Sequence, residues 1–192
     1  MKILARNIAA GFLALLMTAP LLSAQAKEYA IDVKGAHAFV QFRIKHLGFS
    51  WLYGRFNTFD GTFSYDPNDD SKNTVEVVVD VASIDTSHAE RDKHLRADKY
   101  LNVAKFPQAK FVSTKYVSTG EKSAKLTGNL TLLGVTKEVV VDVEYIGGGK
   151  DPWGGERVGF EGTTTINAQD FGVETAWVQD VDLIWSVEGI AK

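Results

Sequence analysis

Apolar and polar residues alternate one by one along most of this chain, a period of two that is typical of β-strands with one buried face. The clearest example runs from Thr74 to Ala82, where four valines at every second position face away from Glu76 and Asp80. The same pattern recurs in 125–132 and 136–146, which a tight turn joins into a predicted hairpin. Alternation over so much of the sequence predicts an all-β fold.

Eight extended segments are predicted, and short connections join nearly all of them. They cover residues 28–46, 55–65, 74–82, 110–117, 125–132, 136–146, 158–166 and 181–187. An antiparallel up-and-down sheet of eight strands closes naturally into a barrel, which removes its exposed edges. Such a barrel is filled by its own side chains or holds one small ligand. Small inward residues at Gly61, Gly128, Gly162 and Thr164 either open an apolar channel or mark taper and bends.

One stretch in the middle, residues 83–101, breaks the alternation and is predicted to be helical. Ser87 followed three residues later by Glu90 is a capping box at a helix start. Asp92 and Arg96 are four residues apart, so their opposite charges can meet on one helix face. We therefore predict an eight-stranded antiparallel barrel with a helical insertion after the third strand, which plugs or braces the sheet.

The first 26 residues have the organisation of a cleaved secretory signal peptide. Lys2 and Arg6 form its charged start, Ile8 to Met17 its short apolar core, and Ala24-Gln25-Ala26 its cleavage site. The apolar core is too short to span a bilayer comfortably. We expect the mature chain, residues 27–192, to form one domain in the periplasm.

Charge and cysteine content argue against several classes of function. Removing Lys2 and Arg6 from the 21 basic residues leaves 19 against 24 acidic ones, a net charge of −5. A domain with this charge has no electrostatic reason to bind nucleic acid or an anionic membrane surface. The chain has no cysteine, which removes disulfides, thiolate metal sites and cysteine nucleophiles. No histidine pair has the spacing of a helical zinc site, so no metal site is predicted.

The connection from Leu47 to Tyr53 is very apolar for a loop, since loops normally run over the surface. Two interpretations remain open at this point. The side chains fold back over the mouth of the barrel, or they form a contact surface.

Several motifs are similar to those of a known family. They are His37-Ala38-Phe39-Val40, His46-Leu47-Gly48, and the segments 59–63, 91–96, 106–114, 128–137, 151–155 and 181–189. On these motifs the chain resembles the YceI-like proteins, exported bacterial barrels described as polyisoprenoid-binding. The resemblance covers essentially the whole mature chain. It implies a lipocalin-like barrel that holds a long-chain isoprenoid lipid in its pore and often dimerises.

The leading hypothesis is a non-enzymatic periplasmic carrier of an isoprenoid lipid, of polyprenyl phosphate or prenyl-quinone type, without a cofactor. The predicted pore lining consists of Val40, Phe42, Ile44, Phe59, Phe63, Leu130, Val141, Phe160 and Trp185. Phe49, Trp51 and Leu52 are expected to guard the mouth, and His46 to meet the polar head of the lipid. A homodimer and a transient membrane contact for lipid exchange complete the expected partners.

Two other classes of function stay open on the sequence. In the first, the protein is an enzyme acting on isoprenoid or quinone lipids through Arg91, Asp92 and His94, which offer acid, base and charge within one helical turn. In the second, it is a packed barrel that serves as a stress-related interaction protein, with the apolar connection as its partner surface.

Overall fold

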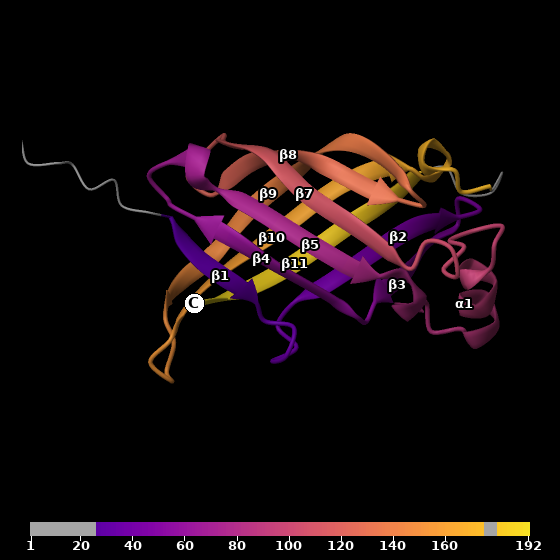
Figure 1. Cartoon of the computed structure of the whole chain (residues 1–192), viewed down its shortest axis with the longest axis horizontal. Coiled ribbons are helices and arrows are strands. Elements are labelled where there is room, and N and C mark those ends of the chain that lie inside the picture. The colour runs from indigo at the N-terminus through magenta and orange to yellow at the C-terminus, as the bar shows by residue number, and fades with distance from the viewer. Residues whose placement is uncertain (1–25, 175–179) are drawn as a thin grey trace, which may run out of the picture.

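Strand β1 (Lys27–Ile31) pairs antiparallel with the last strand, β11 (Asp180–Ala191), and this pairing closes the sheet into a barrel (Figure 1). The computed structural model describes residues 26–174 and 180–192. The predicted signal peptide therefore lies, except for Ala26, outside the described residues. Within these two ranges, every helix is too short or too polar to cross a membrane.

The remaining elements follow in chain order. The strands are β2 (Phe39–His46), β3 (Ser50–Phe56), β4 (Phe59–Tyr65), β5 (Thr74–Asp80), β6 (Ile84–Asp85), β7 (Gln108–Ser118), β8 (Ser123–Leu132), β9 (Val135–Lys150) and β10 (Glu156–Asn167). The helical elements are the α-helix α1 (Ala89–Arg96) and the 3-10 turns η1 (Asp70–Lys72), η2 (Val81–Ser83) and η3 (Ala168–Phe171).

Eight antiparallel staves build the barrel, where a stave is either one strand or two strands that follow each other in line. Three of the eight staves consist of two segments each. β2 continues β1 along β11, β3 continues β4 along the β1–β2 stave, and β6 extends the stave that begins with β5. β7 to β11 then form a simple meander. The predicted eight-stranded antiparallel up-and-down barrel with a helical insertion after its third stave is confirmed.

The first stave, predicted as one extended segment, is interrupted by a turn after β1. Asp32 makes this turn, because its Oδ1 accepts the backbone N–H of Gly35 at 2.8 Å. A Cβ on Gly35 would lie 2.5 Å from the Asp32 carboxylate, so the turn requires glycine. Ala36 follows with a positive φ of 58°. The Lys34-Gly35 turn signal is hidden in the sequence by the alternation on either side of it.

The apolar connection predicted over 47–53 is wrong for most of its length. Leu47 and Gly48 have φ values of 52° and 79°, and the N–H of Phe49 bonds the carbonyl of His46 at 3.0 Å, as in a tight hairpin turn. Strand β3 already begins at Ser50 and pairs with β2. The sequence predicts a loop here because the outward Trp51 and Tyr53 flank an inward Leu52, and this continuous apolar run hides the alternation.

Helix α1 is shorter than predicted and is capped by a different residue. His88, not Ser87, is the N-cap, and its Nδ1 accepts the N–H of Arg91 at 3.2 Å. Ser87 has a positive φ of 60°, and its N–H bonds the side chain of Asp85. The preceding residues form η2 and β6 instead of helix, so the insertion begins with a short strand.

Asp92 and Arg96 of α1 bond the adjoining segment and not each other. Asp92 is buried and accepts both the N–H and the hydroxyl of Thr86, at 2.9 and 2.5 Å. Arg96, the predicted partner of Asp92, instead donates to the carbonyl oxygens of Ala82 and Ile84 at 2.7 and 2.6 Å. These bonds hold the insertion against η2 and β6, at one end of the barrel (Figure 1).

Beside two of the inward glycines, the space that a side chain would fill is taken by a neighbouring side chain, so these glycines do not open a channel. A Cβ on Gly128 would lie 2.4 Å from the ring of Phe111, and a Cβ on Gly61 would lie 2.8 Å from Ile31. Both glycines therefore provide space for a larger neighbour, which is the taper that the sequence left open. Gly162 differs, because it lines a cavity.

Candidate functional site

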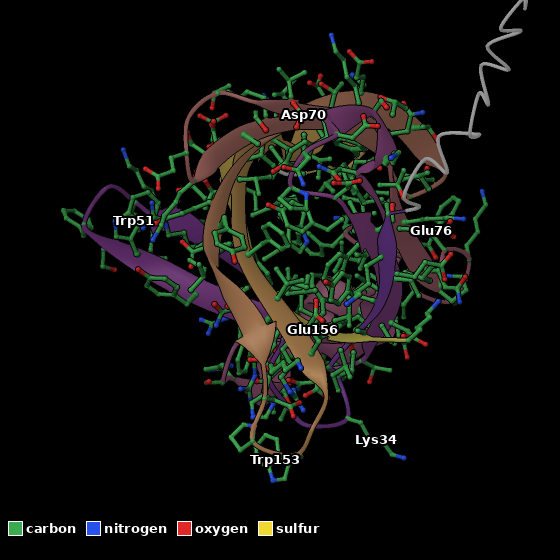
Figure 2. The ribbon with its side chains drawn as sticks, turned by 90° about the vertical axis from the view of Figure 1, so that its left-hand side faces the viewer. Lys34, Trp51, Asp70, Glu76, Trp153 and Glu156 are labelled. Atoms are coloured by element: carbon green, nitrogen blue, oxygen red, sulfur yellow. The ribbon has the colours of Figure 1, made fainter. Side chains whose placement is uncertain are left out.

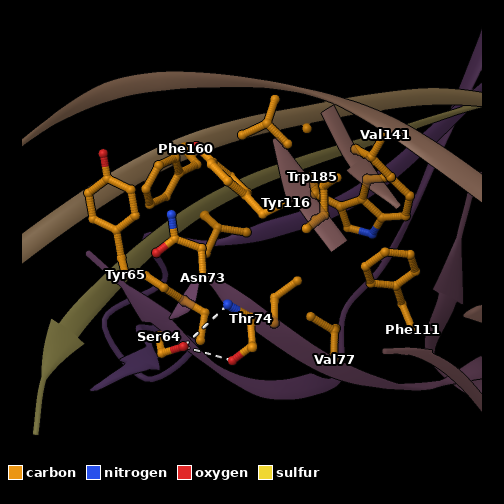
Figure 3. A pocket seen from close by; sticks show the side chains of 16 residues that line it. Ser64, Tyr65, Asn73, Thr74, Val77, Phe111, Tyr116, Val141, Phe160 and Trp185 are labelled. Atoms are coloured by element: carbon orange, nitrogen blue, oxygen red, sulfur yellow. Dashed lines mark hydrogen bonds between the residues drawn. The ribbon is translucent and has the colours of Figure 1, made fainter. Parts of the chain in front are cut away.

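Two apolar cavities lie next to each other inside the barrel. The smaller has a volume of about 110 Å³ and lies between β4, β5, β7 and the strands β8 to β11 (Figure 3). The larger, about 210 Å³, lies between the same barrel wall, the β2–β3 hairpin and the helical insertion. Trp185 lines both cavities, and its ring packs 6.1 Å from that of Phe111, measured between centroids. Apolar, concave and divided only by side chains, this interior suits a long apolar ligand.

Nine of the thirteen predicted ligand-binding residues line these cavities. Phe63, Val141 and Phe160 line the smaller one, Val40, Phe42, Ile44, Leu52 and Leu130 the larger one, and Trp185 both. Phe59 packs beside them against the buried core cluster. Strand parity therefore identifies the inward positions well.

The other three predicted residues lie on the surface of the β2–β3 hairpin. Phe49 is 87 % exposed and Trp51 is 41 % exposed, and His46 is exposed at the end of β2. Figure 2 shows Trp51 on the hairpin that stands out from the barrel. Its ring is covered by the guanidinium of Arg43, 4.2 Å from the ring centroid. The expectation that Phe49 and Trp51 fold over the mouth is thus not met, and they form an outward-facing surface.

The helical insertion adds cavity residues that the sequence analysis missed. Leu95, Tyr100 and Leu101 line the larger cavity together with Arg91. A sequence signal exists, since these are apolar positions within an otherwise charged segment, but nothing in the sequence shows which end of the barrel they cover. The insertion therefore forms one wall of the larger cavity as well as bracing the sheet.

The smaller cavity carries the polar group that sequence reasoning also missed. Asn73 precedes β5, is 6 % exposed, and lines the cavity near Tyr65 and Tyr116 (Figure 3). Burial raises the pKa of Tyr116 to about 12, with a further contribution from the negative charge of Asp70. Burial likewise raises the pKa of Tyr65. Both phenols therefore stay uncharged at neutral pH.

A second polar cluster joins the β1–β2 turn to the ends of β10 and β11. Arg157 donates to Asp32 at 2.7 Å, to Asp151 at 2.9 Å and to Glu188 at 2.5 Å. Oxygen and nitrogen atoms of Asp32, His37 and Glu188 lie within 4.8 Å of one another, a grouping that can suit a metal ion. The guanidinium already supplies positive charge to two of these groups, so we assign the cluster a structural role.

We expect this cluster to make stability depend on acid pH. Hydrogen bonds from His37 and Arg157 lower the pKa of Asp32 from its usual 3.8 to about 2. Because the folded-state pKa lies below the unfolded-state value, Asp32 stabilises the protein above pH 3.8, and this contribution is lost as pH falls through about 2. Urea unfolding of wild type and Asp32→Asn across that range is the measurement. The free energy of unfolding should fall more steeply with acid in the wild type, and parallel curves would contradict the assignment.

Comparison with known proteins agrees with this architecture. The YceI-like domain matches residues 29–188. A UPF0312 protein of Pseudomonas aeruginosa (strain LESB58) is 54 % identical over 172 residues, which cover 88 % of this chain and 90 % of that protein.

Solved structures share the same fold. The crystal structure of the Campylobacter jejuni YceI protein has a TM-score of 0.71 at 32 % identity, covering 78 % of this chain and 90 % of that chain. A polyisoprenoid binding domain from Saccharophagus degradans has a TM-score of 0.64 at 17 % identity, covering 85 % of this chain and 98 % of that chain. Since the domain match extends from β1 to β11 and so spans the whole closed sheet, the chain belongs to the YceI-like family.

Proposed function

We propose that this protein is a periplasmic carrier or reservoir that holds a long-chain isoprenoid lipid inside its barrel. The observation that carries the proposal is the pair of neighbouring apolar cavities on either side of Trp185. Transfer of a prenyl chain from water into such surroundings is favourable by about 25 cal/mol per Å² of buried apolar surface. The name of the Saccharophagus degradans domain, which shares the fold, supports the same class of ligand.

The lipid chain would occupy both cavities and pass the side chain of Trp185. Trp185 lines both cavities and packs against Phe111, which lines the smaller one, so we propose that a rotation of the Trp185 side chain joins them. The branched methyl groups of isoprene units suit a lining of valine, leucine and phenylalanine, where dispersion contacts accumulate.

Organic extraction of the purified protein, followed by mass spectrometry, tests the carrier proposal. We expect one isoprenoid species in near-stoichiometric amount. A protein that contains no lipid and binds none when prenyl lipids are added would favour the interaction-protein alternative.

Filling the larger cavity should abolish lipid retention without unfolding the barrel. Val181 lines this cavity at the start of β11, so Val181→Trp places an indole where the chain would run. Val140→Trp is the matched control, because Val140 is 48 % exposed on the outer face of β9. We expect extracted lipid to fall at least about tenfold in Val181→Trp, because the indole and the lipid chain would overpack the same space, at a cost of about 1–3 kcal/mol. The lipid content of Val140→Trp should be unchanged. Equal lipid content in both variants would place the ligand elsewhere.

The three residues of the enzyme alternative are either hydrogen-bonded within the protein or exposed on its surface. Arg91 and Asp92 both bond Thr86, and His94 is exposed on the outer side of α1. We propose that these residues are structural and that the lipid leaves unchanged. Incubation of wild type and His94→Ala with the extracted lipid tests this, because loss of the lipid's original mass only in the wild type would make the protein an enzyme.

We also propose that the outer face of the β2–β3 hairpin contacts the membrane during lipid exchange. Residues 33–59 contain no aspartate or glutamate, although the mature chain is acidic as a whole. On this face Lys45 stands opposite Trp51 and Arg43 opposite Tyr53. Aromatic and basic side chains together are typical of surfaces that bind anionic membrane interfaces. The inner face of the same hairpin lines the larger cavity, so docking would bring the lipid store to the bilayer.

Flotation with vesicles of phosphatidylethanolamine and phosphatidylglycerol tests this contact. Lys45→Gln should weaken binding about fivefold, because each basic residue near an anionic surface contributes about 1 kcal/mol. Lys122→Gln, in the exposed turn before β8, should have no effect. Vesicle binding that is unaffected by Lys45→Gln would contradict the membrane proposal.

A homodimer formed through the same hairpin remains a separate prediction. Light scattering of wild type and Trp51→Ser examines it.

A further inference from the structure

The wall of the barrel has a break beside the β2–β3 hairpin. One edge of β3 pairs with β2 along its whole length, but on the other edge β6 pairs only with Arg55 and Phe56. Within the described residues, no strand pairs with that second edge over residues 50–54. Leu52, in the middle of this stretch, lines the larger cavity. Backbone hydrogen bonds therefore do not seal the cavity on this side, although sheet edges are normally paired or covered.

The insertion that follows β6 contributes the facing wall of the same cavity through side chains. Leu95, Tyr100 and Leu101 line it together with Leu52. In the part of the chain that the structure describes, the backbone hydrogen bonds of residues 97–106 all stay within the insertion, for example from the N–H of Leu101 to the carbonyl of Leu95 at 3.0 Å. The insertion is thus a unit of its own, and no backbone ladder ties it to the barrel.

The side-chain hydrogen bonds that attach α1 to the barrel reach one short segment, residues 82–86. Near the start of the helix, the buried Asp92 accepts two hydrogen bonds from Thr86. In its last residue, Arg96 donates to the carbonyls of Ala82 and Ile84 at 2.7 and 2.6 Å. Ala82 is exposed and Arg96 half-buried, so water can replace the second contact more easily than the first.

This difference gives the insertion a fixed end and a releasable end. The fixed end is the three-residue connection 86–88 between β6 and α1, where Ser87 has a positive φ of 60°. A few residues at the end of an element are enough for a hinge. At the releasable end, Leu95 precedes Arg96 and is bonded by Leu101, so the cavity-lining side chains move with the end of the helix.

We propose that the insertion is a lid that swings about residues 86–88 when Arg96 releases the carbonyls of Ala82 and Ile84, and that the lipid chain passes through the break beside β3. The inference rests on the proposed carrier function and adds to it the route of the lipid. Because the other face of the same hairpin is the proposed membrane contact, docking would place this break next to the bilayer.

A lid has a kinetic signature that distinguishes it from a wall of the cavity. The contact made by Arg96 is the same with and without lipid, so its loss changes the opening equilibrium equally in both states. The rate constants for association and dissociation then change by the same factor, and the dissociation constant stays almost constant. Loss of a contact between wall and lipid would instead raise the dissociation rate alone.

The absence of cysteine from the chain allows chemical control of the contact made by Arg96. In Ala82→Cys/Arg96→Cys the reduced protein lacks the guanidinium. A short bis-methanethiosulfonate reagent then joins the two thiols and holds the end of α1 in place until a reductant removes it. The probe is all-trans-retinol, a fluorescent isoprenoid, whose binding to delipidated protein and release to excess phosphatidylcholine vesicles are followed by stopped flow.

We expect both rate constants to rise at least about tenfold in the reduced variant, since two charge-assisted hydrogen bonds are lost. In the tethered variant both should fall at least about tenfold below wild type, and reductant should restore the fast rates. The dissociation constant should stay within about twofold of wild type in every state. The matched control is Lys125→Cys/Asp142→Cys, an exposed pair on the neighbouring strands β8 and β9, where the tether should change neither rate.

Hydrogen exchange measured by mass spectrometry provides a second readout. The hydrogen-bonded amides of residues 89–106 should exchange as one unit and faster than those of β7 to β11, because a local opening exposes them together. Their exchange should accelerate in the reduced variant and slow under the tether. Arg96→Lys, which keeps the charge and can keep one hydrogen bond, should lie between wild type and the reduced variant in both measurements.

Two results would overturn the proposal. Retinol rates that are equal in wild type, Arg96→Lys and the tethered variant would mean that the chain enters through another part of the barrel. A dissociation constant that rises in step with the dissociation rate would make Arg96 a support of the cavity wall and not of a lid. If delipidated wild type binds neither retinol nor squalene, the carrier function itself fails. If it binds them and the tether has no effect, only the lid fails.

Discussion

Phe171→Ala is expected to lower the free energy of unfolding by about 3–5 kcal/mol, the range for deleting a fully buried phenylalanine side chain. Phe171 is 2 % exposed and packs in the buried cluster that also contains Phe111, Leu130, Val141 and Ile166. Truncation to alanine would leave a void that the surrounding β-strands cannot close, because their backbone hydrogen bonds fix their separation. Urea unfolding at neutral pH measures the effect.

The position of Phe171 in the chain makes this residue a plug. It ends η3, the turn that follows β10, and Gly172 then reverses the chain with a φ of 86°. Phe49→Ala is the matched control, because the same truncation at a side chain that is 87 % exposed should change stability by less than about 0.5 kcal/mol. A loss below about 1 kcal/mol in Phe171→Ala would mean that the barrel end collapses around the smaller residue and needs no plug.

Asp92→Ala should cost about 2–4 kcal/mol, since it removes a buried carboxylate that accepts two hydrogen bonds. Both donors belong to Thr86, which would be left with an unpaired N–H and hydroxyl beside the guanidinium of Arg91. If Asp92 bonded Arg96, as their spacing in the sequence predicts, this variant would leave an unpaired cation. The structure instead predicts an unpaired threonine and a loosened junction between β6 and α1.

Asp92→Asn keeps a hydrogen-bond acceptor and removes the negative charge. The amide keeps one oxygen for Thr86, so the loss of stability should be clearly smaller than in Asp92→Ala. Equal losses in the two variants would show that the negative charge matters and not the hydrogen-bond geometry. Because α1 lines the larger cavity, Asp92→Ala should also release lipid faster than Asp92→Asn.

The barrel could be predicted because one-sided burial leaves a period of two in each strand. Val40, Phe42 and Ile44 show this directly, since alternate positions of β2 face the cavity. The pattern failed at β3, where Trp51 and Tyr53 are large and apolar but point outward. Outward aromatic residues next to an inward Leu52 produce a continuous apolar run, which no period describes.

The remaining errors concern choices that only three-dimensional neighbours decide. Ser87 is a better helix cap than His88 by residue type, but the bond from its N–H to Asp85 commits it to the turn before the helix. Asn73 looks like an ordinary turn residue, because it ends the polar stretch 66–73 that begins with Asp66-Pro67. Its buried Nδ2, which has no hydrogen-bond partner among the described residues, is visible only when the buried donors and acceptors are paired one by one. The sign of the local charge on the hairpin was likewise hidden by the net charge of the whole domain.

The seam between β1 and β11 joins the first strand of the sheet to the last, with Tyr29 beside Ala191. Contacts between such distant parts of a chain form late, because the whole intervening loop must first be ordered. The barrel therefore cannot close until its final strand is available, and its folding should be slow compared with that of a helical protein of equal length. A chain built in this way stays open while it is being synthesised, and its apolar interior is sealed from water only after the last strand is in place.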